Sequence, residues 1–262
     1  MGRVSFGQQL ARVSEGLLES VTDLLLFQFY LTTQMVGAHT TFQMERAVDE
    51  AHNILDDVNY KTIKSVLYTL TQTKHIERTA HRTILDVSIT DLGKKRITSR
   101  FPMYHDKRPW DGHMYLVSYD IPNKARGMRN VLREQIRKAG AALLQESLWV
   151  TPYNPHLLLE DFSQRHHHPG TIIVSKLGRD GAIGAENLTD LLVRIYHLAS
   201  VSSRYEKFIE TYGHTRPQIT LSASIAYCAI LKDDPQLPFP LEPKNFPGKR
   251  AHDLFLRILA NG

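Results

Sequence analysis

The chain has 262 residues, of which 42% are hydrophobic, and a formal net charge of +5. This length is enough for two or three folded modules. The single cysteine, Cys228, excludes an internal disulfide framework and a zinc site built from cysteines, and its apolar neighbours predict a buried thiol. The start of the chain lacks the apolar segment of a signal peptide, and no apolar run reaches membrane-spanning length. We therefore expect a cytoplasmic protein without membrane contact.

The charge is unevenly placed along the chain. Residues 1–58 hold three Lys or Arg against eight Asp or Glu, a net of −5, whereas residues 59–108 hold eleven against four, a net of +7. A local positive field attracts a polyanion and supplies the salt-dependent part of nucleic-acid affinity. This asymmetry favours nucleic-acid binding by the second region.

The first regular elements expected are helices over residues 22–34 and 42–55, each with its apolar side chains on an inward face. Residues 56–58 form the turn into a third helix, over residues 59–70, whose start Asn59 can cap. The apolar side chains of this third helix share one face at the i, i+3, i+4, i+7 spacing: Ile63, Val66, Leu67 and Leu70. The order helix, helix, turn, helix is that of a helix-turn-helix module.

The opposite face of the third helix carries long or hydrogen-bonding side chains, of the kind that contact phosphates and base edges in a major groove. These residues are Tyr60, Lys61, Lys64, Ser65 and Tyr68. We expect them, with Asn59 at the helix start, to face double-stranded DNA.

Two short β-like runs follow, over residues 75–78 and 83–90, joined by a polar and basic tip that contains His81 and Arg82. Together with a closing basic helix over residues 92–100, capped by Asp91, they complete a winged helix-turn-helix pattern. His81 and Arg82 are expected to contact phosphates or the minor groove. A solvated amphipathic helix with an ordinary hairpin has the same periodicity, so this alternative stays open.

The middle of the chain predicts a second module after a proline-containing linker at residues 101–112, where Trp110 is expected to pack between domains. The expected elements are a strand at 114–121, a helix at 124–139, strands at 141–145 and 147–151, a helix at 156–164 and a strand at 171–177. The order βαββαβ is that of a ferredoxin-like module.

The predicted helix at 124–139 carries four arginines at spacings of three, four and four residues, which places them on one face. These are Arg126, Arg129, Arg133 and Arg137. Such a ridge is typical of a solvated helix face, with contact to phosphate or to a partner protein as the alternative.

The rest of the chain is mostly helical, with helices expected at 187–210, 218–231 and 251–259. The whole chain is thus predicted to be α+β, with a DNA-binding domain at 1–100, a linker at 101–112, a ferredoxin-like dimerisation module at 113–180 and a helical module at 181–262.

The most specific sequence pattern is in the tail, in Asp234-Pro235-Gln236-Leu237-Pro238, in Leu241-Glu242-Pro243-Lys244-Asn245-Phe246-Pro247-Gly248 and in Ala251-His252-Asp253-Leu254-Phe255. This tail resembles that of the phenylacetate-catabolism repressors of the PaaX type, with Phe246 where the family usually has Trp. Ile121-Pro122 and the stretch from Gln145 to Pro152 resemble the central module of the same family.

The resemblance implies a homodimeric transcriptional repressor without metal or cofactor, released from its operator by an aryl-acyl-CoA thioester such as phenylacetyl-CoA. The residues themselves do not identify the effector site. The glycine-rich stretch at 178–184 lacks the glycine spacing and the following helix of a phosphate-binding motif.

The central module also resembles the small CRISPR-associated nuclease of spacer-acquisition complexes, whose first strand ends in an aspartate proposed to bind a divalent metal. Asp120 stands at the corresponding strand end, although capping the turn at Pro122-Asn123 explains an aspartate equally well. His166-His167-His168 points in alternating directions, which favours a polar loop over a metal site. The alternatives to a repressor are therefore a metal-dependent nuclease and a nucleic-acid-binding adaptor.

Overall fold

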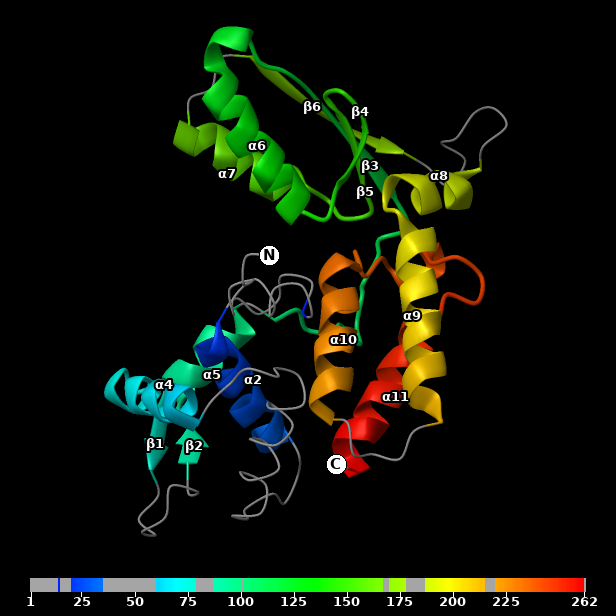
Figure 1. Ribbon diagram of the computed structural model, residues 1–262. Coiled ribbons are helices and arrows are strands. Elements are labelled where there is room, and N and C mark those ends of the chain that lie inside the picture. Colours follow the sequence, from blue (N-terminus) through cyan, green and yellow to red (C-terminus); the bar gives the residue numbers. More distant parts are fainter. Residues whose placement is uncertain are drawn as a thin grey trace, which may run out of the picture. The chain divides into compact units, whose positions relative to one another are not determined.

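A computed structural model describes residues 14, 20–34, 60–78, 87–99, 101–166, 170–177, 187–214 and 220–261 (Figure 1). The chain is a mixed α+β protein that divides into two compact units. Unit 1 comprises residues 1–104, 203–233 and 247–262, and unit 2 comprises residues 105–202 and 234–246. Each unit is therefore built from segments that lie far apart in the sequence.

Unit 1 begins with α2 (Val21–Gln34), in which the run from Leu24 to Phe27 is almost fully buried. Burial of four consecutive residues means that α2 is covered on more than one face, as expected of a core helix. Ser20 caps α2: its Oγ accepts a hydrogen bond from the Asp23 backbone N–H at 3.1 Å and donates one to the Asp23 carboxylate at 2.7 Å. Asp23 also holds Arg96 of a later helix at 3.0 Å.

The predicted third helix is α4 (Tyr60–Gln72), and it is followed by the antiparallel pair β1 (Ile76–Arg78) and β2 (Val87–Ile89). Ile76 and Ile89 are opposite each other and buried. The closing helix, α5 (Asp91–Thr98), begins one residue earlier than expected. Its cap is Thr90 and not Asp91, because Thr90 has an extended backbone and its hydroxyl accepts the Gly93 N–H at 3.1 Å. The predicted helix at 42–55, the turn at 56–58, the wing tip at 79–82 and the first part of the second β-like run, residues 83–86, lie outside the described residues.

Unit 2 is organised around a four-stranded sheet with the order β4-β5-β3-β6, in which all neighbouring strands are antiparallel. The strands are β3 (Met114–Asp120), β4 (Ala142–Gln145), β5 (Leu148–Thr151) and β6 (Thr171–Leu177). The connections contain η1 (Asn123–Ala125) with α6 (Arg126–Lys138), and α7 (His156–His166). This topology is the ferredoxin-like βαββαβ arrangement, so the fold predicted for this module is confirmed.

The two faces of this sheet are covered by different segments. On one face, α6 and α7 lie side by side and bury Trp149, Leu132 and Phe162 (Figure 1). On the other face, α8 (Leu188–Ile195) and the tail segment with η2 (Phe239–Leu241) pack against Met114 and Val150. The first part of the tail that resembles the PaaX pattern, residues 234–246, is thus packed in unit 2, whereas residues 251–255 of the same pattern belong to unit 1.

The single long helix expected at 187–210 is two helices, α8 and α9 (Leu198–Gly213). The break falls at His197, which has a left-handed backbone with φ 54°. Next to it, the Tyr196 hydroxyl donates to the carbonyl oxygens of Gly140 at 2.7 Å and Val150 at 3.0 Å. The apolar periodicity runs through the break, which is why the sequence pattern did not reveal it.

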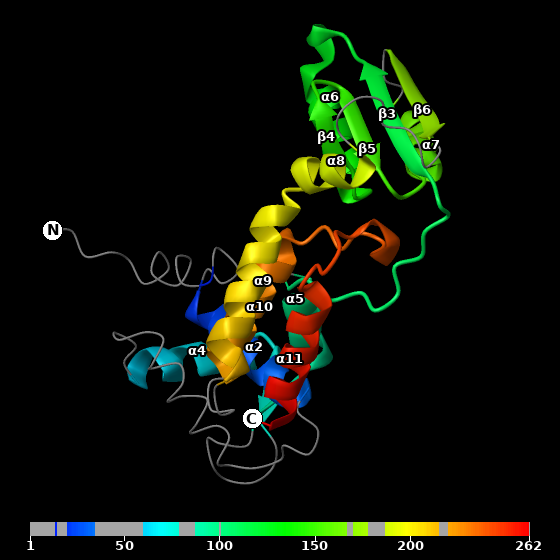
Figure 2. The same cartoon turned by 90° about the vertical axis from the view of Figure 1, so that its right-hand side faces the viewer.

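The remaining helices of unit 1 are α10 (Thr220–Asp233) and α11 (Gly248–Asn261), and they run alongside α9 (Figure 2). Tyr227 of α10 stacks on Phe255 of α11 with ring centroids 4.3 Å apart. Cys228 is buried as predicted, and burial raises the pKa of its thiol to about 12. Within the described residues, no helix combines the length and the apolar character that crossing a membrane requires.

Candidate functional site

The face of α4 that was expected to meet DNA is exposed where the structure describes its side chains. Ser65 is exposed and Tyr68 has 63% of its surface exposed, whereas Leu70 is completely buried. Val66 and Leu67 are half-buried. The helix therefore has an inner and an outer face at the predicted positions. Asn59 and the side chains of Tyr60, Lys61 and Lys64 lie outside the described residues, so their placement stays a prediction.

The junction of α4, the β pair and α5 is held by a compact set of backbone contacts around His75. The His75 N–H donates to the Leu70 carbonyl at 2.9 Å, and its own carbonyl accepts the Thr90 N–H at 3.0 Å. A Cβ on Gly93 would come within 2.2 Å of the His75 carbonyl oxygen, so only glycine allows α5 to approach so closely. Burial and the nearby Arg96 lower the pKa of His75. These contacts hold the end of α4 against the β pair and α5.

The expected wing residues His81 and Arg82 lie outside the described residues. Of the basic side chains in α5, Lys94 and Lys95 are exposed, and Arg96 is held by Asp23. Lys94 is 3.6 Å from Asp91. The outer surface of α5 therefore continues the basic character that the sequence places after residue 59.

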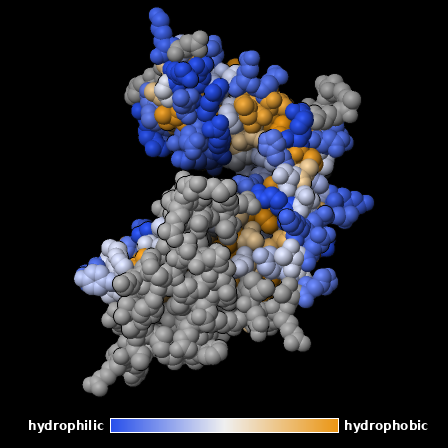
Figure 3. Space-filling model, in the orientation of Figure 1, coloured by the Kyte–Doolittle hydropathy of each residue, from blue (hydrophilic) through white to orange (hydrophobic). Residues whose placement is uncertain are grey.

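Only some of the arginine side chains in the ridge of α6 are free of contacts with the rest of unit 2. Arg126 is exposed and Arg129 is half-buried. The Arg133 Nε donates to the Tyr119 hydroxyl at 2.7 Å, and the Arg137 guanidinium lies 5.5 Å from the centre of the Trp149 ring. The surface over α6 is strongly hydrophilic (Figure 3). Two of the four arginines therefore stabilise the contact of α6 with the sheet, in addition to any contact with a partner.

Asp120 ends β3 with its side chain exposed. Its carbonyl lies against Gly170, where a Cβ would come within 2.0 Å of the oxygen. Among the described residues, no group of three or more His, Cys, Asp or Glu side chains could hold a metal ion. His166 ends α7 with its ring 4.7 Å from that of Phe162, and His167 and His168 lie outside the described residues.

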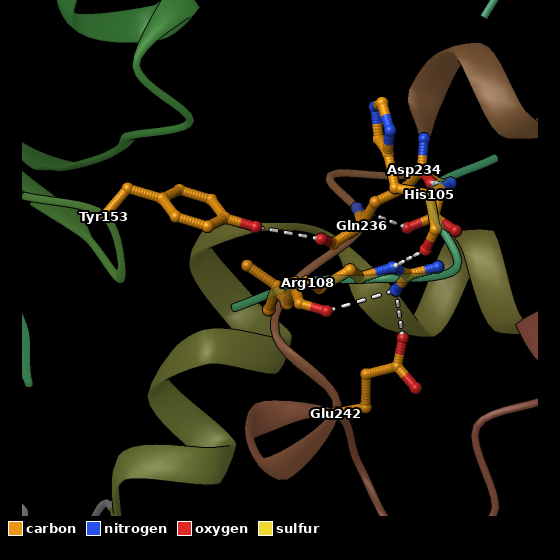
Figure 4. A network of polar contacts seen from close by, with 7 residues as sticks. His105, Arg108, Tyr153, Asp234, Gln236 and Glu242 are labelled. Atoms are coloured by element: carbon orange, nitrogen blue, oxygen red, sulfur yellow. Dashed lines mark hydrogen bonds and ion pairs between the residues drawn. The ribbon is translucent and has the colours of Figure 1, made fainter. Parts of the chain in front are cut away.

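A polar network in unit 2 was not predicted from the sequence (Figure 4). Its centre is Arg108, whose side chain is only 2% exposed. The guanidinium donates from Nε to the His105 carbonyl at 3.1 Å and from one terminal nitrogen to the Leu237 carbonyl at 3.1 Å. The same nitrogen lies 2.6 Å from Glu242, with which it forms a partly buried ion pair. Burial raises the pKa of Glu242, and Arg108 only partly offsets this effect.

Gln236 connects three parts of this network. Its backbone N–H donates to Asp234 at 2.8 Å, its side-chain oxygen accepts the His105 N–H at 2.8 Å, and its carbonyl accepts the Tyr153 hydroxyl at 3.1 Å. Gln236 has φ 48°, a left-handed backbone conformation that residues other than glycine rarely adopt. Burial, with a further contribution from Asp234, raises the pKa of Tyr153.

A signal for this network was present in the sequence. The tail pattern Asp234-Pro235-Gln236-Leu237-Pro238 and the stretch at 101–112 each combine prolines with charged residues. The second of these was interpreted as a linker, but its Arg108 and Trp110 pack into unit 2, and the Trp110 Nε1–H donates to the His113 carbonyl at 2.8 Å. Nothing local in the sequence distinguishes Arg108 from the other arginines, because its acidic partner is 134 residues away.

Together these features define a protein with a ferredoxin-like central module flanked by helical segments and a small β pair. Residues 107–178 match the family described as the PaaX protein central Cas2-like domain. The match confirms the predicted resemblance to the PaaX type for this stretch of the chain.

One solved structure has a similar fold over almost the whole chain. It is that of the uncharacterized protein Rv0674 from Mycobacterium tuberculosis, which covers 90% of this chain and 92% of its own, with a TM-score of 0.56 and 18% sequence identity. At this identity the similarity concerns the fold alone. No curated protein matches the chain.

Proposed function

We propose that the protein is a sequence-specific, DNA-binding transcriptional regulator that acts as a homodimeric repressor. The observation that carries this proposal is the outer face of α4, where Ser65 and Tyr68 are exposed while Leu70 is buried. The β pair and α5 follow directly, in the order of a winged helix-turn-helix module. The region from residue 59 to 108 has a net charge of +7, which suits a polyanionic partner.

The match to a PaaX-type central domain supports the same proposal, because the resemblance of the sequence to the PaaX type implies a repressor. In the proposed mechanism, Lys61 and Lys64 contact phosphates, Ser65 and Tyr68 contact base edges, and His81 and Arg82 of the wing contact the adjacent backbone. A dimer would place two such helices on the half-sites of a palindromic operator. A small acyl-CoA-like effector would release the operator by binding more tightly to the DNA-free state.

The test is a salt-titrated binding assay with the upstream region of the protein's own gene and a scrambled duplex of equal length. We expect the upstream fragment to bind more tightly than the scrambled one. The double variant Lys61→Ala with Lys64→Ala should weaken binding to both, and should lower the slope of log K against log salt by about two, since each phosphate contact contributes about 0.9. Tyr68→Ala should instead reduce the difference between the two duplexes.

A matched control removes two exposed lysines elsewhere, Lys124→Ala with Lys207→Ala, and should leave the slope unchanged. Equal binding of both duplexes by the native protein would contradict a sequence-specific regulator and would favour an adaptor. Repeating the assay with Mg²⁺ and the variant Asp120→Asn tests for a nuclease: cleavage that requires Mg²⁺ and disappears in the variant would assign catalysis to β3.

A further inference from the structure

The network around Arg108 forms part of the wall of an open cavity of about 510 Å³ that lies within unit 2. The wall is assembled from the segment before β3, the end of α6, the loop after β5 and the tail. Its polar residues are His105, Lys107, Arg108, Lys138, Tyr153 and Gln236. A volume of this size is in the range of about 300–1,000 Å³ typical of small-molecule sites.

Two lysines make this cavity positively charged. Lys107 and Lys138 are both exposed and both line it. Within the part of the chain that the structure describes, neither forms an ion pair or a side-chain hydrogen bond. Of the two carboxylates in the network, Glu242 pairs with Arg108, and Asp234 accepts the Gln236 N–H and keeps its negative charge; neither pairs with either of these two lysines. The positive charge of the two lysines is therefore available to a ligand.

Part of the cavity wall is held by close contacts between its segments. Gly140 has φ 75°, and a Cβ at this position would come within 2.9 Å of the Tyr153 ring, so the ring lies directly on the glycine. On its other end, the Tyr153 hydroxyl is held by the Gln236 carbonyl, whose own left-handed backbone is fixed by hydrogen bonds to His105 and Asp234 (Figure 4). A preformed wall reduces the entropic cost of ordering side chains on binding.

We propose that this cavity binds a small organic anion with at least two negative charges at one end. The charged end would lie between Lys107 and Lys138, and the neutral remainder would lie against Pro109, Ala139 and Pro235, which supply the apolar part of the wall. This inference does not depend on the proposed DNA-binding function, since the cavity lies entirely in unit 2.

The experiment is isothermal titration of the full chain with four probes: adenosine diphosphate, citrate, pyrophosphate and adenosine. Comparison of adenosine diphosphate with citrate shows whether the cavity prefers phosphate or carboxylate groups. Pyrophosphate carries the charge without a neutral part, and adenosine carries a neutral part without the charge, so these two probes measure the two contributions one at a time. We expect at least one of the two organic anions to bind more tightly than pyrophosphate, and adenosine not to bind. Raising the salt concentration should weaken binding, because the lysines are exposed.

Three variants locate the binding. Lys107→Ala and Lys138→Ala should each weaken it by about twofold to fivefold, the upper part of the range expected for one exposed charge contact. Lys124→Ala, in η1 before the start of α6, should leave it unchanged. The double variant Lys61→Ala with Lys64→Ala should also leave it unchanged, which separates the cavity from the candidate DNA surface. Absence of binding by all three anions at 10 mM, or equal binding by the Lys107, Lys138 and Lys124 variants, would overturn the proposal.

Discussion

The two candidate sites are built in opposite ways. The candidate DNA surface of unit 1 comes from one continuous stretch, from α4 to α5, and its outward side chains Ser65 and Tyr68 are not needed for packing. The cavity of unit 2 is assembled from segments around residues 105, 138, 153 and 236, and its central side chain, Arg108, is itself buried. Outward residues in unit 1 can therefore change with little effect on folding, whereas a change at the cavity centre alters both the site and the stability of the unit.

Removing Arg108 should give the largest effect. Arg108→Met leaves the half-buried Glu242 without its cation and removes the three hydrogen bonds of the guanidinium, and we expect the free energy of unfolding of unit 2 to fall by about 3 kcal/mol. Urea denaturation, followed by hydrogen exchange of the β3 and β5 amides, measures this loss. The control Arg165→Met removes the exposed pair with Asp161 in the same unit and should cost less than about 1 kcal/mol. Similar losses in both variants would show that Arg108 is not the structural centre of the cavity.

Two glycines allow the same perturbation to be made in each unit. An alanine at Gly170 would place Cβ 2.0 Å from the Asp120 carbonyl, and one at Gly93 would place it 2.2 Å from the His75 carbonyl. We expect each substitution to destabilise its own unit by about 1–3 kcal/mol or more, because the obstacle is backbone. Hydrogen exchange resolved by segment should show faster exchange in unit 2 for Gly170→Ala and around α4 and α5 for Gly93→Ala.

The control for both is Gly127→Ala in α6, where an added Cβ meets nothing within 4 Å. This change should stabilise unit 2, by up to about 1 kcal/mol, since alanine favours the helix. If Gly93→Ala left the exchange of α4 and α5 unchanged, the close approach of α5 to the His75 carbonyl would not be what holds the candidate DNA surface together.

Removing the Tyr196 hydroxyl should have a smaller effect. This group donates to two carbonyl oxygens, of Gly140 and Val150, and so ties the start of the helical region to the cavity wall and to β5. Tyr196→Phe keeps the ring and loses these bonds, which should cost unit 2 about 1 kcal/mol. Thermal unfolding monitored by circular dichroism measures the loss. A change in DNA affinity without a change in stability would contradict this purely structural role.

The same tyrosine shows where prediction from the sequence fails. The periodicities of the strands and helices in the central module depend on local spacing, so they gave the correct order of elements and the ferredoxin-like topology. The break between α8 and α9 lies next to Tyr196, whose hydroxyl bonds to the carbonyl of Gly140, 56 residues earlier, and no local pattern contains that contact. The sequence pattern predicts one continuous helix because α8 and α9 both bury an apolar face and the apolar spacing is kept across the break.

The candidate sites differ for the same reason. The alternation of buried and exposed positions in α4 can be derived from residues 60–72 alone, and the structure places Ser65, Tyr68 and Leu70 accordingly. Arg108 is separated from Glu242 by 134 residues. In the sequence it is one of many arginines, and only the fold shows that it is buried and paired. Lys107 and Lys138 are likewise 31 positions apart in the sequence, and only the fold shows that both line one cavity.

The smallest effect concerns the dependence of unit 1 on pH. The pKa of His75 is lowered in the folded state by burial and by Arg96, so folding favours the neutral ring. The stabilisation that this provides is present above the unfolded pKa of about 6.5, and it is lost as the pH falls through the lower folded value. In His75→Gln, which does not titrate, the melting temperature of unit 1 should fall less between pH 7.5 and pH 5 than in the native protein. Equal pH dependence in both proteins would show that His75 does not link proton uptake to the junction that positions α4.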